Sequence, residues 1–146
     1  MHSNASLPFN FERSYCKFHL LTGKLAKLTN LKCLILEKLY AGVAKAFSQL
    51  ETLHLESLHI TDLIYTSDVE SISRSAGKMN TLKILEIQTN DRGCLWLSRL
   101  TNLEELVVRE SEISVVGLLE LSKMQSLRKI TFQYCEDIGK EFKIQF

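Results

Sequence analysis

The sequence lacks the features that mark membrane-spanning, secreted and disulfide-rich proteins. Among its 146 residues there is no run of 18 consecutive apolar side chains, so we expect no bilayer-spanning helix. The amino terminus has no basic region followed by an apolar run, so no secretory signal is expected. The four cysteines form no CxxC pair. This favours reduced thiols in a cytoplasmic or nuclear protein over a disulfide framework.

Net charge and catalytic motifs are equally sparse. The net charge is +1, which offers no bulk attraction for nucleic acid or for an anionic membrane. The sequence contains no glycine-rich phosphate loop, no HExxH and no GxSxG. His54 and His59 are expected in one strand region, on opposite faces, where they could not share a metal ion. We therefore expect no enzyme activity, no cofactor and no metal site.

What the sequence does contain is leucine at regular intervals. In Leu103–Ile113, LEELVVRESEI, apolar residues alternate with polar ones, which predicts a short strand with one buried face. The frame LxxLxL recurs, and each clear copy follows an apolar residue and two polar ones. The copies start near residues 6, 31, 50, 82, 103 and 127, and the first is degenerate (Ser6, Phe9, Phe11).

This period and pattern resemble the leucine-rich repeat superfamily over nearly the whole chain. Cys135, at the ninth position of its unit, is similar to the cysteine-containing repeats of F-box proteins, and Asn90 and Ser111 are polar at that position. The resemblance implies an α/β fold, a right-handed β/α solenoid of about five to six repeats with a parallel sheet on its concave face. Because single repeats cannot bury their apolar faces alone, we expect residues 1–146 to form one domain, either complete or a fragment of a longer protein.

Three segments depart from the regular pattern. A helix is predicted at about Asp68–Ala76, where apolar residues share one face, and it should stop at Gly77. The only tryptophan, Trp96, is expected to pack in the core or at a cap. Phe142–Phe146 alternates like a further strand, and its uncapped edge would favour association.

The concave face is the expected binding surface, with an acidic amino-terminal half and a basic carboxy-terminal half. Three carboxylates, Glu12, Glu37 and Glu56, fall six residues after the start of successive units. They form either a solvated face with local neutralisation or an acidic recognition stripe. The candidate protein-binding residues are Glu12, Ile35, Glu37, His54, Glu56, Ile84, Glu86, Val107, Arg109 and Tyr134.

These features favour a protein-recognition module that binds a protein partner, not nucleic acid or a membrane. The F-box resemblance implies substrate recognition for a ubiquitin ligase, in which case an F-box would lie in a longer form or in another subunit. Two alternatives stay open: the sensor end of an intracellular immune receptor, and a truncated fragment without function.

Overall fold

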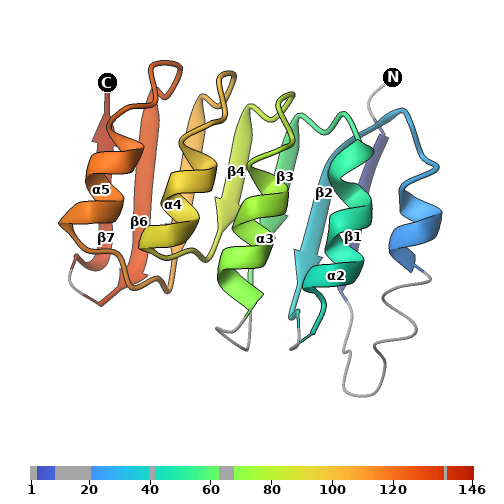
Figure 1. Ribbon diagram of the computed structural model, residues 1–146, viewed down its shortest axis with the longest axis horizontal. Helices are drawn as coiled ribbons and strands as arrows, with labels where there is room; N and C mark the ends of the chain where they lie inside the picture. Colours follow the sequence, from blue (N-terminus) through green and yellow to red (C-terminus); the bar gives the residue numbers. More distant parts are fainter. Residues whose placement is uncertain (1–2, 9–20, 40–41, 63–67, 137) are drawn as a thin grey trace.

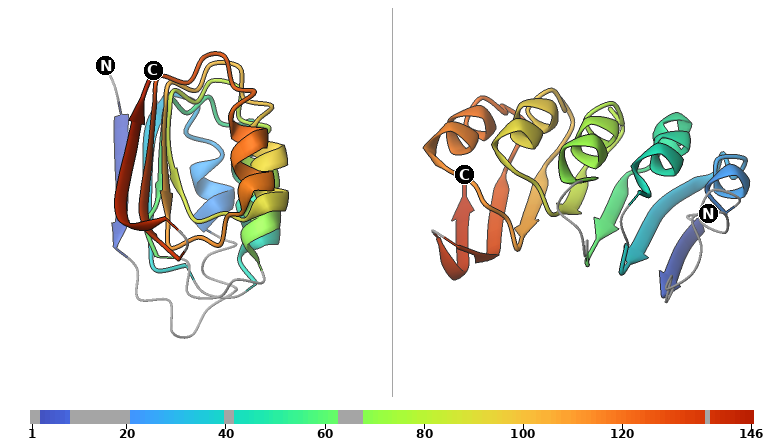
Figure 2. Two further views of the ribbon diagram at one scale, coloured as in Figure 1. Left: turned by 90° about the vertical axis from the view of Figure 1, so that its left-hand side faces the viewer. Right: turned by 60° about the horizontal axis from the view of Figure 1, so that its bottom comes forward.

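The protein is an α/β structure in which one sheet carries its helices on a single face (Figure 1; Figure 2). The computed structural model describes residues 3–8, 21–39, 42–62, 68–136 and 138–146, and residues 3–8 are described by their backbone. The strands are β1 (Ser3–Pro8), β2 (Leu31–Glu37), β3 (Ser57–Ile60), β4 (Ile84–Ile87), β5 (Glu105–Arg109), β6 (Lys129–Cys135) and β7 (Gly139–Gln145). The helices are residues 21–25, α2 (Ala44–Phe47), the 3-10 helix η1 (Ser48–Thr52), α3 (Val69–Ala76), α4 (Asp91–Leu97) and α5 (Val115–Leu121).

The sheet follows the order of the sequence. Strands β1 to β6 pair as parallel neighbours, and β7 pairs antiparallel with β6. Figure 2 shows the helices stacked side by side behind the strands. The predicted α/β fold with a mostly parallel sheet is therefore confirmed at this level.

Buried leucines align from strand to strand and form one continuous core. One inward position in each of the strands β2 to β6 is occupied in register by Leu34, Leu58, Leu85, Leu106 and Ile130. These side chains are between 0 and 4% exposed. Each fully buried Leu or Ile stabilises the fold by about 1.5–3 kcal/mol, so the shared row also fixes the register of neighbouring strands.

The predicted frame of the third copy is wrong. We expected a strand beginning at Leu50, but Leu50 lies in η1 and the strand is β3, seven residues later. The unit therefore starts at Leu55, which is fully buried. Two overlapping frames, LETLHL and LESLHI, both place leucine or isoleucine at the required positions. Only the second frame lies 24 residues after the unit that starts at 31 and 27 residues before the unit that starts at 82. This even spacing places β3 in register with β2 and β4.

Both ends of the sheet also differ from expectation. Ala5 and Leu7 of β1 pair with Leu34 and Leu36, so the first unit lies about four residues before the predicted Ser6 frame. Its expected residues Phe9 and Phe11 lie outside the described residues. At the other end, a strand does form over the predicted 142–146 segment, but it runs antiparallel to β6.

On the helix face, the predicted α3 is confirmed, with its carboxy-terminal cap at Gly77. Gly77 is required there because a Cβ atom would lie 2.5 Å from the carbonyl oxygen of Trp96. Trp96 itself is only partly buried, so the structure does not place it in the core. The guanidinium carbons of Arg74 and Arg99 lie 4.8 and 4.3 Å from its ring centroid. Each such cation–π contact is worth about 0.5–1 kcal/mol at an exposed site.

Two of the three residues at the ninth position of the leucine pattern, Ser111 and Cys135, form hydrogen bonds to the neighbouring strand segment. The hydroxyl of Ser111 accepts a hydrogen bond from the backbone N–H of Thr89 at 2.9 Å. The thiol of Cys135 donates to the carbonyl of Val108 at 3.6 Å. The side chain of Asn90 instead caps the first turn of α4. Burial raises the pKa of the Cys135 thiol, which keeps it protonated and able to donate.

The strand register makes a first testable prediction at Leu106 and Val107. Leu106 is fully buried, whereas Val107 is half-buried on the opposite face of β5. Leu106→Ala should lower the free energy of unfolding by about 2–5 kcal/mol, because it removes buried surface and leaves a cavity. Val107→Ala should lower it far less. Urea unfolding of both variants measures the difference, and equal losses would contradict the register.

Candidate functional site

The face of the sheet that carries no helix is the candidate site. Its side chains are those that alternate with the buried leucines. Two rows cross the sheet: Cys33, Ser57, Ile84, Glu105 and Lys129 form one, and Ile35, His59, Glu86, Val107 and Thr131 form the other. We call this surface the helix-free face. A third, shorter row adds Arg109 and Gln133.

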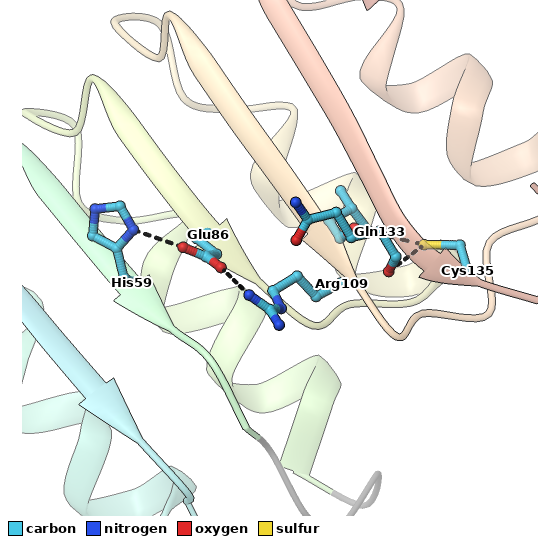
Figure 3. A network of polar contacts seen from close by, with 6 residues as sticks. His59, Glu86, Arg109, Gln133 and Cys135 are labelled. Carbon is cyan, nitrogen blue, oxygen red and sulfur yellow. Dashed lines mark hydrogen bonds and ion pairs between the residues drawn. The ribbon is translucent and has the colours of Figure 1, made fainter. Parts of the chain in front are cut away.

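A charged hydrogen-bond network lies in the middle of the helix-free face (Figure 3). The carboxylate of Glu86 on β4 lies 2.8 Å from Nδ1 of His59 on β3. Its other oxygen accepts a hydrogen bond from Nη1 of Arg109 on β5 at 2.7 Å. Ser57 Oγ lies 2.7 Å from the remaining ring nitrogen of His59. The network thus ties three neighbouring strands together through side chains.

The network is partly shielded from water. The side chains of Glu86, His59 and Arg109 are 15%, 26% and 27% exposed. The hydrogen bond from His59, with help from Arg109, lowers the pKa of the Glu86 carboxyl although burial opposes this. The Glu86 carboxylate in turn raises the pKa of Arg109. Charge-assisted hydrogen bonds of this length are stronger than neutral ones, so they hold the three side chains in defined positions.

Apolar and paired charged side chains surround the network. Ile35, Ile84 and Val107 are half-buried on the same face. Glu105 and Lys129 form an ion pair at 3.7 Å between β5 and β6. The central part of the helix-free face therefore combines fixed charge with half-buried aliphatic surface.

A ladder of alternating charge runs along the edge where the strands begin. Here a backbone N–H of each unit donates a hydrogen bond to a backbone carbonyl of the preceding unit. The donor and acceptor pairs are Glu56 to Lys32, Lys83 to Glu56, Glu104 to Lys83, and Arg128 to Glu104. Lys32 and Glu56 also form an ion pair at 3.9 Å. An open hollow of about 290 Å³ lies here, lined by Lys32, Glu56, Thr81, Lys83, Asn102 and Glu104. Opposite charges on adjacent strands contribute roughly 0.2–1 kcal/mol per pair.

This ladder corrects the expected acidic stripe. Glu56 precedes β3 and lies beside lysine at the edge, so it does not stand in line with Glu37. Glu12 lies outside the described residues. Glu37 is half-buried at the end of β2. The described residues therefore give no row of three carboxylates and no acidic amino-terminal half of the helix-free face.

The structure brings five of the ten predicted residues together, and Glu12 lies outside the described residues. Those that lie on the two central rows or beside them are Ile35, Ile84, Glu86, Val107 and Arg109. His54 is exposed ahead of β3 and outside any strand, so placing it with His59 in one strand was wrong. Tyr134 is 62% exposed near the end of β6.

Sequence reasoning missed His59 and Ser57. The frame starting at Leu50 assigned the outward positions of the third unit to His54 and Glu56. In the frame starting at Leu55, Ser57 and His59 take outward positions, as they do in the structure. The even spacing of the units was the signal that could have found them.

The order of atoms from Ser57 through His59 to Glu86 resembles a nucleophile, its base and an orienting carboxylate. An acyl-transfer site also needs donors aimed at an oxyanion. Ser57 lies in a strand that pairs on both sides, where the backbone N–H groups serve the sheet. A second hollow of about 100 Å³ is lined by Val69, Gln88, Thr89, Asn90, Glu110 and Glu112. Neither hollow is lined by Ser57.

Among the described residues, no cluster of three or more His, Cys, Asp or Glu side chains has the geometry of a metal site. None of the helices in this part of the chain is long and apolar enough to cross a bilayer. Burial raises the pKa of Cys94 to about 12, so its thiol stays protonated at neutral pH.

The sequence was also compared with known proteins. A scan against protein-family models gives no match, and a search of curated proteins finds no relative.

Glu86 makes a prediction on pH dependence. Because its pKa in the folded state is below the ordinary value of 4.5, its contribution to stability is complete above that pH. The contribution is lost as the pH falls through the lowered folded-state pKa. Glu86→Gln should therefore destabilise the protein by about 1–3 kcal/mol at pH 7, where His59 and Arg109 lose a charged partner.

The matched control for that experiment is Glu104→Gln, which changes an exposed carboxylate outside the network. Urea unfolding is measured at pH 7 and below pH 4. The penalty of Glu86→Gln should shrink in acid, whereas Glu104→Gln should have little effect at either pH. A penalty for Glu86→Gln that is the same at both pH values would rule out an ionised Glu86 as the source.

Proposed function

We propose that this chain is a leucine-rich repeat solenoid that binds a protein partner through the helix-free face. The observation that carries the proposal is the network of His59, Glu86 and Arg109, fixed across three strands at the middle of that face. Side chains that are already ordered lose little conformational freedom on binding, so more of their contact energy contributes to affinity.

The chemistry of this face fits a protein better than a small molecule. Arginine and large apolar side chains are enriched where protein interfaces carry most of their binding energy. Here Arg109 lies on the same face of β5 as the half-buried Val107, two residues along the strand. Small-molecule sites are usually enclosed, whereas the two hollows lie at the edges of the sheet and are not lined by the network.

The repeat class has its own support. Leucine or isoleucine occupies one inward position, in register, in five successive strands, and the strands follow one another in sequence order. Such stacking of one supersecondary unit is the architecture of a solenoid. The hydrogen bond of Cys135 to the neighbouring unit supports the cysteine-containing type. Within this class we propose substrate recognition for a ubiquitin ligase, with the sensor end of an immune receptor as the alternative.

The binding face is tested with a matched pair of arginine substitutions. Partners are captured from cell extract on the wild-type protein and identified by mass spectrometry. The affinity of each purified partner is then measured for Arg109→Leu and for Arg92→Leu, which changes an 83% exposed arginine on α4. Arg109→Leu should weaken binding at least about tenfold, because it removes a central interface arginine. Arg92→Leu should leave binding unchanged.

Partners that bind both variants as tightly as the wild type would contradict this assignment of the face. Thermal unfolding of each variant separates a binding defect from unfolding. Ligase adaptor subunits among the partners would favour the ligase role, whereas receptor signalling domains would favour the immune role.

Binding in preference to catalysis is tested at Ser57. The protein is treated with a fluorophosphonate probe, which reacts covalently with activated serine nucleophiles. We expect labelling of the wild type to equal that of Ser57→Ala, because an oxyanion site is missing around Ser57. Labelling that depends on Ser57 would overturn the proposal and make the Ser57–His59–Glu86 chain a hydrolytic site.

A further inference from the structure

Strand β7 forms the end of the sheet, and one of its edges has no neighbour among the described strands (Figure 1). It pairs with β6 without a bulge, from Lys129 opposite Gln145 to Cys135 opposite Gly139. An exposed edge of this kind presents backbone donors and acceptors to another strand. The feature does not depend on the function proposed above.

The direction of the backbone groups on β7 follows from its pairing with β6. The N–H of Phe146 donates to the carbonyl of Arg128, toward β6. In a regular antiparallel pair, residues alternate in the side to which their N–H and C=O groups point. The backbone groups of Ile144 and Phe142 therefore also point toward β6, and those of Glu141 and Lys143 point to the open edge.

We propose that two copies of this protein pair through their β7 edges as an antiparallel, two-fold symmetric dimer centred on Phe142. Strand β7 spans Gly139–Gln145, so Phe142 is its middle residue. Full overlap of two such strands places Glu141 opposite Lys143 of the other copy, and Lys143 opposite its Glu141. These are the residues whose backbone groups face the open edge.

Charge selects this register over its neighbours. Moving the two-fold axis to Glu141 would place two glutamates opposite each other, and moving it to Lys143 would place two lysines opposite each other. Like charges directly opposite on paired strands are unfavourable, and opposite charges are favourable. Glu141 and Lys143 lie 2.9 Å apart within one copy, so the dimer would join two such pairs into an alternating cluster.

Apolar surface on the other face of β7 supports the same register. Phe142 lies opposite the buried Phe132 of β6, on the face that carries the helices. It is nevertheless 49% exposed, and it would meet its own copy across the axis. Residues directly opposite in an antiparallel pair have Cβ atoms about 4.5–5.5 Å apart, so the two phenylalanine rings would cover each other.

Lysine on an edge strand normally discourages pairing with other strands. Across the open edge, Lys143 faces a second carboxylate only when the other strand carries glutamate two residues earlier and runs antiparallel. The edge therefore accepts a second copy of itself and disfavours an unrelated apolar strand. A two-fold contact of this type is closed, since each copy uses its single β7 edge.

Sedimentation velocity over a concentration series, with charge-exchange variants, tests the dimer. The wild type should show a reversible equilibrium between monomer and dimer up to millimolar concentration. Glu141→Lys and Lys143→Glu should each weaken the dimer by at least about tenfold at low salt, because each places like charges across the axis. The double exchange, Glu141→Lys with Lys143→Glu, should restore dimerisation, as should an equimolar mixture of the two single variants.

Arg92→Glu is the matched control, because it reverses one exposed charge on α4 and should leave the equilibrium unchanged. A wild type that remains monomeric at all concentrations would overturn the proposal. Dimers that survive both single variants would do so as well, and so would growth into open-ended oligomers.

The register is tested directly by crosslinking. Phe142→Cys would bring two introduced thiols across the axis within reach of a disulfide. Ile144→Cys, on the same face of the same strand, would face Lys140 of the other copy. Under mild oxidation Phe142→Cys should form a covalent dimer and Ile144→Cys should not. Equal crosslinking of the two variants would overturn the proposed register.

Discussion

The structure depends on the burial of one apolar row shared by consecutive strands. Each unit is short, with a strand of four to seven residues and a helix of four to eight, and buries its leucines only because the next unit covers them. The row from Leu34 to Ile130 is the result. Because the residues of this row must lie in register on adjacent strands, the number of residues between units is constrained more tightly than the identity of any single residue.

That constraint explains how far the sequence could predict the fold. The α/β character and the strands β2, β4, β5 and β6 followed from the leucine pattern. The third unit could not be placed from its own residues, because the frames that start at Leu50 and Leu55 both supply leucine or isoleucine where a buried side chain is needed. The neighbours decide between them. The choice also sets the outward positions, so the same error replaced His59 and Ser57 with His54 and Glu56.

The sequence did indicate that β7 runs antiparallel to β6, but the repeat pattern obscured that indication. Parallel neighbours need a crossover of a dozen or more residues, whereas antiparallel strands can join through a short turn. Only residues 136–138 separate β6 from β7. The turn ends at Gly139, whose φ of +98° favours glycine. Connection length therefore determines the direction of the last strand. The alternation over residues 142–146 showed only that a strand was present.

The helix-free face reflects a balance between burial and charge. Removing Glu86 from water is unfavourable, and the protein compensates by giving the carboxylate two partners, one on each neighbouring strand. Glu105 likewise has a basic partner, Lys129, on the adjacent strand. A face neutralised pair by pair has little long-range attraction for a partner. Recognition here would therefore depend on short-range fit to side chains already fixed in place, and it would be sensitive to any substitution that leaves Glu86 without a partner.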